Sequence, residues 1–214
     1  MTTEAIHVAT RMHGRVLVRE ARQPSLMLVG FHGYMENAAI QMERLSGIEG
    51  SERWTLVSVQ GLHRFYRGRS DEVIASWMTR QDRELMIEDN IEYARQVLER
   101  VSTSDTPVIT VGFSQGVAMA FRTAVRAPQA IAAVVAVGGD VPPELFADAA
   151  AAFPPSLIVR GERDEWYTAE IAKKDLAALR ARSADAEYFV HSGGHEWTME
   201  VSAAVAAFIA KFAG

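Results

Sequence analysis

The stretch PVITVGFSQG, residues 107–116, joins a short apolar run to a serine that stands between two glycines. Its first seven residues are typical of a strand that is buried on both faces. Its last five residues have the G-x-S-x-G form of a sharp turn between a strand and a helix, which raises a serine hydroxyl above a parallel sheet. Glycine is needed on either side because neighbouring elements crowd these positions. We therefore expect an exposed hydroxyl at Ser114 and a helix that starts at Gln115.

Similar apolar runs recur on both sides of this strand, at residues 26–32, 54–60, 130–137, 156–160 and 187–191. Apolar residues at helical spacing lie between some of them, at 87–101 and after the last run at 197–212, and the Ala-rich residues 147–152 indicate a short helix. This alternation predicts a mostly parallel, doubly wound sheet with helices on both faces and with functional loops after the strands. The chain between residues 137 and 156 is too short for a large cap domain.

Two segments stand outside this alternation. Residues 5–10 and 14–19 look like two short strands hinged at Gly14, which would form an antiparallel pair. Residues 61–83 form the longest irregular stretch, and loops of that length are usually functional or disordered. Because 214 residues are too few to divide comfortably into two domains, we expect a single domain over residues 1–214.

The composition excludes several classes of function. The 27 acidic and 22 basic side chains give a net charge of −5, so there is no positive field to attract nucleic acid or an anionic membrane. The absence of cysteine excludes disulfides, thiolate nucleophiles and cysteine-based metal sites. The first residues lack the features of a secretory signal, and no run reaches the roughly 18 apolar residues of a membrane span. A cytoplasmic protein is therefore expected.

Two more loops carry side chains that could activate Ser114. His195, in the sequence HSGGHEWT after the last strand, could take the serine proton as a general base. Asp164, in the sequence GERD, could accept the Nδ1 proton of that histidine, and Asp140 is the alternative acid. The chain order Ser, Asp, His is the one expected for such a turn. His191 and His195 lack a third ligand, so no metal site is expected.

The sequence FHGY, which follows the run at 26–32, supplies the remaining part of the site. We expect an oxyanion hole made of the backbone N–H groups of Tyr34 and Gln115, with His32 bracing the loop. Bulky side chains in or near these loops could line an apolar acyl pocket, and the candidates are Tyr34, Met35, Trp77, Trp166 and Trp197.

Taken together, these residues resemble the phospholipase/carboxylesterase family of small serine esterases, which is related to the acyl-protein thioesterases. The resemblance rests on FHGY at 31–34, GFSQG at 112–116, GERD at 161–164 and GGHEW at 193–197. It implies the α/β-hydrolase fold and the hydrolysis of carboxylic esters or thioesters through an acyl-enzyme, without a cofactor. Two loops depart from the family pattern, HGYMEN at 32–37 and DEWY at 164–167, so substrate preference is not carried over.

Three functions remain open at this point. The first is a serine hydrolase of small, soluble carboxylic esters, acting as a monomer or a homodimer. The second is an acyl-protein thioesterase or a lysophospholipase, which uses the same chemistry on other substrates. The third, from a different class, is a non-catalytic ligand-binding protein on the same fold, and the presence of Ser114, Asp164 and His195 together argues against it.

Overall fold

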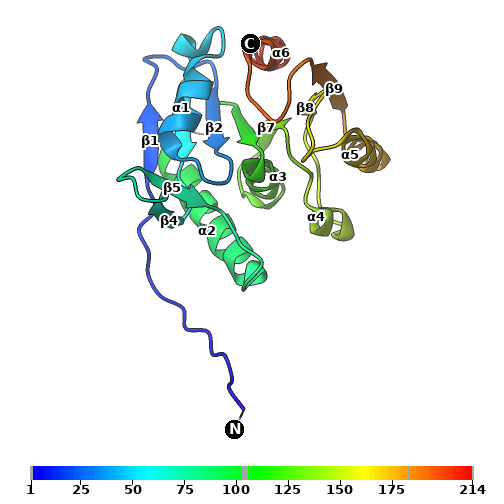
Figure 1. The fold of residues 1–214 in the computed structure, drawn as a ribbon. Coiled ribbons are helices and arrows are strands. Elements are labelled where there is room, and N and C mark those ends of the chain that lie inside the picture. The colour runs from blue at the N-terminus through cyan, green and yellow to red at the C-terminus, as the bar shows by residue number, and fades with distance from the viewer. Residues whose placement is uncertain (1, 103–105, 183, 214) are drawn as a thin grey trace.

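A seven-stranded sheet forms the centre of the computed structural model, which describes residues 2–102, 106–182 and 184–213. The strands lie in the order β1-β3-β2-β6-β7-β8-β9, and all neighbours are parallel except β1, which runs antiparallel to β3 (Figure 1). Their bounds are Val16–Arg19 for β1, Met27–Phe31 for β2, Thr55–Val59 for β3, Val108–Phe113 for β6, Ile131–Val137 for β7, Ser156–Gly161 for β8 and Ala186–His191 for β9.

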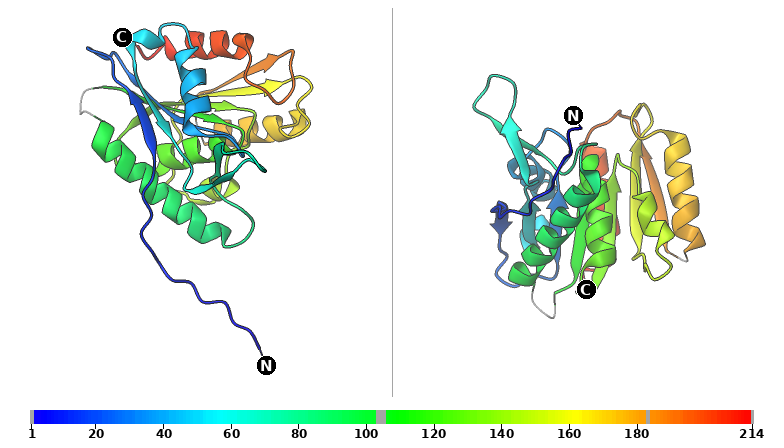
Figure 2. Two further views of the ribbon diagram at one scale, coloured as in Figure 1. Left: turned by 60° about the vertical axis from the view of Figure 1, so that its left-hand side comes forward. Right: turned by 90° about the horizontal axis from the view of Figure 1, so that it is seen from below.

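Helices cover both faces of this sheet (Figure 2). One face carries α1 and α6, and the other carries α2, α3, α4 and α5. The bounds are Ala38–Ser46 for α1, Arg83–Val101 for α2, Gln115–Arg126 for α3, Pro143–Ala147 for α4, Ala169–Ala181 for α5 and Met199–Ile209 for α6, with a 3-10 turn, η1, at Ser51–Arg53. Successive residues of β2 enter opposite cores: Leu28 packs on the α1 and α6 side, and Val29 on the α2 and α3 side.

The predicted fold class is confirmed in these features. Each of the six apolar runs forms a strand of the parallel part of the sheet, and the helix after Ser114 starts at Gln115 as expected. Only α4 and a short loop join β7 to β8, so no cap domain is inserted there. Within the described residues, no helix is both long and apolar enough to cross a membrane.

The prediction for the first residues of the chain is wrong. Residues 5–10 form no strand, and residues 2–14 are exposed and lead away from the sheet (Figure 1). A strand forms only where a neighbouring backbone pairs with its N–H and C=O groups. The strand β1 finds such a neighbour in β3, where Val16 stands opposite Val59. In the preceding residues, the imidazole of His7 lies 2.9 Å from the carboxylate of Asp82.

The stretch at 61–83, expected to be irregular, contains a β-hairpin. Its strands are β4, His63–Tyr66, and β5, Val73–Ser76, which pair antiparallel and project from the rest of the chain (Figure 2, right). Gly68 turns the chain at a φ of 57°, and the N–H of Arg67 donates to the carbonyl of Glu72 at 3.0 Å. The signal for the hairpin was the set of aromatic and β-branched residues on either side of this glycine.

The helix predicted at 147–152 is also displaced. The helix α4 ends at Ala147, because Asp148 turns the chain: its carboxylate accepts the N–H of Ala150 at 2.9 Å, and its carbonyl accepts the N–H of Ala151. Asp148 therefore competes with the helix for these backbone donors, as short polar side chains often do.

Candidate active site

Ser114 sits on a strained turn between β6 and α3. Its φ of 51° and ψ of −122° are unusual for a residue with a side chain. The surroundings hold it there, since its N–H donates to the carbonyl of Val137 at 2.8 Å and its carbonyl accepts the N–H of Val117 at 2.9 Å. A Cβ atom at Gly112 would lie 2.5 Å from the Cα of Val117, and one at Gly116 would collide with the Phe31 carbonyl. Both glycines of the motif are therefore required sterically.

Ser114, His195 and Asp164 lie in one hydrogen-bonded chain. The Nε2 atom of His195 is 2.8 Å from the Oγ of Ser114, and its Nδ1 atom is 2.9 Å from Oδ2 of Asp164. Proton donation from Nδ1 to the carboxylate leaves Nε2 with a lone pair directed at the serine hydroxyl. The side chain of Asp164 is almost fully buried, whereas that of His195 is partly open to solvent.

The Asp164 carboxylate is fixed by its own loop. Its Oδ1 atom accepts the backbone N–H groups of Trp166 and Tyr167, both at 2.9 Å, which leaves Oδ2 for the histidine. The alternative acid, Asp140, is exposed at the end of the loop after β7, and among the described residues it makes no hydrogen bond to His195. The geometry therefore joins His195 to Asp164 rather than to Asp140.

Glycines allow these loops to approach one another. Gly138 has a φ of 64°, and a Cβ atom there would lie 3.3 Å from Cε1 of His195 and 3.5 Å from Oδ2 of Asp164. A Cβ atom at Gly161 would collide with the carbonyl of Gly194. The N–H of Arg163 donates to the carbonyl of Gly193 at 3.0 Å, so the acid loop and the base loop are joined directly.

The two N–H groups expected to form an oxyanion hole belong to Tyr34 and Gln115. Within the described part of the chain, neither the N–H of Tyr34 nor that of Gln115 makes a hydrogen bond. The Gln115 N–H stands at the first position of α3, where the helix dipole favours negative charge. The loop that carries Tyr34 packs on the turn that carries Ser114, since a Cβ atom at Gly33 would lie 3.1 Å from the Phe113 ring.

His32 braces this loop, as the sequence predicted. It is fully buried, its Nδ1 atom lies 2.7 Å from the Gly33 carbonyl, and its Nε2 atom accepts the N–H of Gly61 at 3.0 Å. This pattern requires the neutral tautomer with the proton on Nδ1. Burial accordingly lowers the pKa of His32 from its usual 6.5.

Only some of the expected pocket residues face solvent. Tyr34 is 54% exposed and lies near Phe65 of the hairpin, with 6.3 Å between ring centroids, and Trp166 is 80% exposed beside Asp164. Trp197 is half-buried and packs edge-on against Phe113. Met35 is partly buried in the turn beside Tyr34. Two of these four side chains are therefore exposed, and the other two are partly buried.

Trp77 was expected to line the acyl pocket, and this prediction is wrong. Its indole is fully buried, and its Nε1–H donates to the His32 carbonyl at 2.8 Å. Its backbone N–H donates to the side-chain oxygen of Gln115 at 2.9 Å, while the side-chain nitrogen of Gln115 donates to the Met78 carbonyl. Trp77 thus joins the loop after β5 to the loop after β2 from inside the core, and its N–H has an acceptor there, as is usual for a buried indole.

Sequence reasoning missed three contributors to the site. The side chain of Gln115 anchors the loop after β5, and Glu36 with Arg44 forms an ion pair beneath the turn at Gly33. The only signal for the ion pair was Glu36 in the sequence HGYMEN. Its partner, Arg44, lies in the last turn of α1.

A buried carboxylate lies behind the acid loop. Asp175 of α5 accepts the Val141 N–H and the Tyr167 hydroxyl, each at 3.0 Å on Oδ2. Burial raises the pKa of Asp175 above its ordinary value, and the two hydrogen bonds only partly oppose this rise. Burial, together with the carboxylate of Asp175, also raises the pKa of Tyr167.

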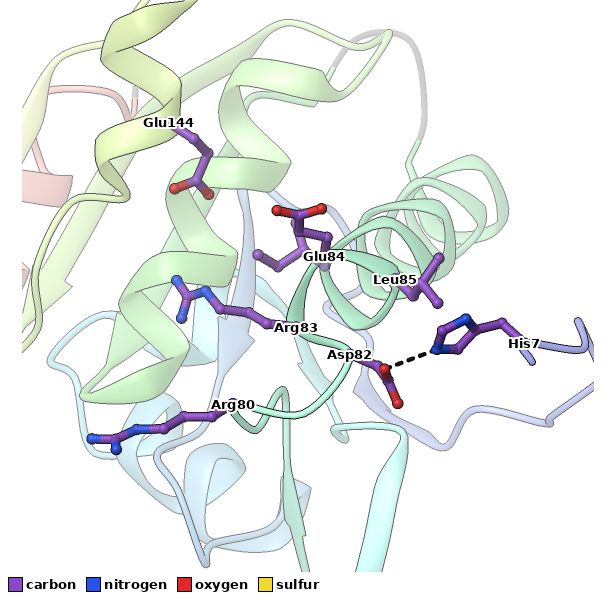
Figure 3. A pocket seen from close by; sticks show the side chains of 8 residues that line it. His7, Arg80, Asp82, Arg83, Glu84, Leu85 and Glu144 are labelled. Atoms are coloured by element: carbon purple, nitrogen blue, oxygen red, sulfur yellow. Dashed lines mark hydrogen bonds and ion pairs between the residues drawn. The ribbon is translucent and has the colours of Figure 1, made fainter. Parts of the chain in front are cut away.

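Two hollows open elsewhere on the surface. One of about 470 Å³ lies at the start of α2, where Arg80, Arg83 and Leu85 line it and His7 contacts Asp82 (Figure 3). The other, of about 600 Å³, continues along α2 towards Arg122. Neither is lined by the residues around Ser114.

His191 is buried and accepts the Gly193 N–H at 3.1 Å, and no group of three metal-binding side chains occurs among the described residues.

Comparisons with known proteins bear on the family and the fold of the chain. The sequence model of the dienelactone hydrolase family matches residues 63–207, which is more than half of the chain. A comparison with curated protein sequences finds no match.

Solved structures share the fold at low sequence identity. The esterase PE8 superposes with a TM-score of 0.73 at 23% identity, covering 95% of this chain and 100% of its own. The acyl-protein thioesterase 2 of Zea mays gives 0.78 at 16% identity, covering 94% and 100%, and a carboxylesterase from Mesorhizobium loti gives 0.74 at 16%, covering 95% and 98%. The α/β-hydrolase fold is thereby confirmed, and the resemblance to small serine esterases agrees with these findings.

Proposed function

The chain belongs to the dienelactone hydrolase family, and from this premise we propose that it is a serine hydrolase that cleaves small carboxylic esters through an acyl-enzyme. One observation carries the proposal: the hydrogen-bonded chain from Asp164 through His195 to Ser114, with separations of 2.9 and 2.8 Å. Such a chain ends in a serine hydroxyl that a general base can deprotonate.

In the first half of the reaction, the Oγ of Ser114 attacks the ester carbonyl carbon while Nε2 of His195 takes the hydroxyl proton. Asp164 stabilises the resulting imidazolium through Nδ1 and does not itself become protonated. The carbonyl oxygen becomes an oxyanion, which the N–H groups of Tyr34 and Gln115 receive. The tetrahedral intermediate then collapses, the carbon–oxygen bond to the alcohol breaks, and the imidazolium returns its proton to the leaving alcohol.

The second half repeats these steps with water. His195 takes a proton from a water molecule, whose oxygen attacks the acyl carbon, and the bond to the Oγ of Ser114 breaks as the serine recovers its proton. Ester and water supply every atom that is exchanged, and the products are the carboxylic acid and the alcohol.

Labelling with a fluorophosphonate tests this proposal. The probe should form one adduct on the wild-type protein, located at Ser114 by peptide mass spectrometry, and Ser114→Ala should abolish both the adduct and ester turnover. Ser192→Ala is a matched control, because this serine is exposed in the same loop as His195 but contacts Glu200 rather than the histidine. A folded wild-type protein that takes no label would favour the non-catalytic binding protein.

The finer question is whether esters or thioesters are preferred. We propose small esters, because Tyr34 and Trp166 are 54% and 80% exposed and so offer little enclosure to a long acyl chain. A chain-length series of p-nitrophenyl esters and matched acyl thioesters should give the highest kcat/KM for short esters. Preference for long acyl thioesters would instead identify an acyl-protein thioesterase.

A further inference from the structure

The turn that presents the Tyr34 N–H is strained. Met35, the next residue, has a φ of 59°, which is rare for a residue with a long side chain. A residue persists in this region only where its surroundings restrain it, and such residues concentrate at functional sites. The restraints on Met35 therefore also restrain the turn that contains Tyr34.

Glu36 restrains this turn from both its backbone and its side chain. Its carbonyl accepts the Ala75 N–H at 2.8 Å, and the Met35 N–H donates to the Ala75 carbonyl at 3.1 Å, which attaches the turn to the hairpin. Its Oε2 atom accepts the N–H of Gly33 at 2.7 Å. The carboxylate thus fixes the nitrogen of Gly33, while the N–H of Glu36 donates at 3.3 Å to the Gly33 carbonyl, which lies in the same peptide unit as the Tyr34 N–H.

Arg44 fixes the carboxylate in turn. Its guanidinium binds both oxygens of Glu36, with Nη1 at 2.6 Å and Nη2 at 2.5 Å, and both side chains are largely buried. Such a two-point pairing gives orientation as well as attraction. The pairing keeps Glu36 charged: burial raises the pKa of this carboxyl, but the hydrogen bonds and charge of Arg44 outweigh burial and lower the pKa overall.

The same guanidinium reaches the nucleophile turn. It lies 4.1 Å from the ring centroid of Phe113, the residue before Ser114, and that ring lies 5.3 Å from the ring of His195. Arg44 therefore contacts both Glu36, in the loop after β2, and Phe113, the residue before the nucleophile. No other ion pair among the described residues connects these two loops.

We propose that Glu36 and Arg44 are positioning residues, which hold the peptide of Gly33 so that the Tyr34 N–H points at the oxyanion formed above Ser114. This inference rests on the proposed esterase function. An oxyanion donor is effective only within about 2.7–3.1 Å of the oxygen in the transition state, so a small rotation of the turn weakens the transition state more than the bound substrate.

Three variants test the pair. Glu36→Gln keeps an oxygen for the Gly33 N–H but places an NH₂ group against the guanidinium. Arg44→Lys keeps the positive charge but cannot make the two-point pairing. Arg44→Met removes both the charge and the pairing. With p-nitrophenyl butyrate, kcat should fall about 10- to 100-fold in Glu36→Gln and Arg44→Met, below the full loss of a donor, and less in Arg44→Lys. KM should change by less than about threefold, because ground-state binding does not use the donor.

A second measurement separates positioning from general loosening. Phenylboronic acid forms a tetrahedral adduct with an active serine, so its Ki should rise by the same factor by which kcat/KM falls. Glu92→Gln is the matched control, since this carboxylate also accepts two hydrogen bonds from one guanidinium, that of Arg95, at 2.7 and 2.6 Å, but lies on α2 and does not touch the Gly33 peptide. Its kcat and its boronate Ki should stay at the wild-type values.

Fluorophosphonate labelling and melting temperature are measured on every variant. If wild-type Ser114 takes no label, the esterase proposal itself fails. If it is labelled but Glu36→Gln and Arg44→Met keep wild-type kcat and boronate affinity, only the positioning role fails. A rise in KM as large as the fall in kcat, or an equal effect in Glu92→Gln, would also overturn it, because the variants would then act by a general loosening of the protein.

Discussion

The hydroxyl of Tyr167 donates a 3.0 Å hydrogen bond to Asp175, while the backbone N–H of the same tyrosine donates to Asp164 at 2.9 Å. One residue thus connects the acid that faces His195 to a second, buried carboxylate on α5. Because Asp175 also accepts the Val141 N–H, it ties together the loops that follow β7 and β8. Both loops surround the histidine, so the state of Asp175 affects the stability of this region.

The first prediction concerns stability against pH. The pKa of Asp175 is raised in the folded protein above its ordinary 3.8, so the folded state prefers the protonated acid. The contribution of Asp175 to the free energy of unfolding is complete below its pKa in the unfolded chain. It is lost as the pH rises through its pKa in the folded protein. Asp175→Asn keeps an oxygen for both donors without a charge, and its melting temperature relative to wild type should therefore rise between pH 4 and pH 8.

Differential scanning fluorimetry at several pH values measures this, with a sensitivity of about 2–4 °C for each kcal/mol in a chain of this size. Asp185→Asn is the control, because this aspartate is exposed. A melting difference between Asp175→Asn and wild type that is the same at all pH values would contradict the raised pKa.

The second prediction identifies the triad acid. Asp164→Asn should lower kcat about 10⁴-fold, as in the protease triad, because an amide donor at this position stabilises the wrong tautomer of His195. Asp140→Asn should leave kcat within about twofold of wild type, since the exposed Asp140 side chain does not reach the histidine. Steady-state hydrolysis of p-nitrophenyl butyrate measures both, and a large loss in Asp140→Asn alone would reverse the assignment.

These features differ in how far the sequence could reveal them. The six strands of the parallel part of the sheet, the turn at Ser114 and the order of the site residues were predictable, because each depends on local periodicity or on a motif whose geometry is set within a few residues. The burial of Trp77 and the pairing of Glu36 with Arg44 were not, because they depend on which loops meet in the folded chain. Residues 5–10 have the alternation of a strand, but alternation cannot supply a pairing partner.

The third prediction concerns acid sensitivity at His32. The pKa of this histidine is lowered by burial from its usual 6.5, so its contribution to stability is present above pH 6.5 and is lost as the pH falls through the folded pKa. Urea unfolding of the wild type should therefore show a falling free energy between pH 7.5 and pH 5.

His32→Gln should be less stable at pH 7.5, because it cannot reproduce the two hydrogen bonds to Gly33 and Gly61, but its free energy of unfolding should fall less steeply with acid. Equal slopes for the variant and the wild type would show that the acid sensitivity arises elsewhere.

The last prediction compares two glycines that differ in backbone conformation and in their surroundings. At Gly116 an added Cβ atom would collide with the Phe31 carbonyl and lie 2.6 Å from that of His32, and these are backbone atoms of the loop that carries Tyr34. At Gly68 the φ is 57° but nothing lies within 4 Å of an added Cβ atom. Gly68→Ala should therefore cost only the left-handed backbone, about 1–2 kcal/mol of unfolding free energy, and should leave kcat unchanged.

Gly116→Ala should cost about 3 kcal/mol or more and should also lower kcat, because relief of the collision must move the early loop away from the turn at Ser114. Urea unfolding and ester hydrolysis on the two variants measure the two effects separately. A Gly116→Ala protein with wild-type kcat would mean that the loop carrying Tyr34 can shift without consequence for the reaction, and the Tyr34 N–H would then have to be abandoned as an oxyanion donor.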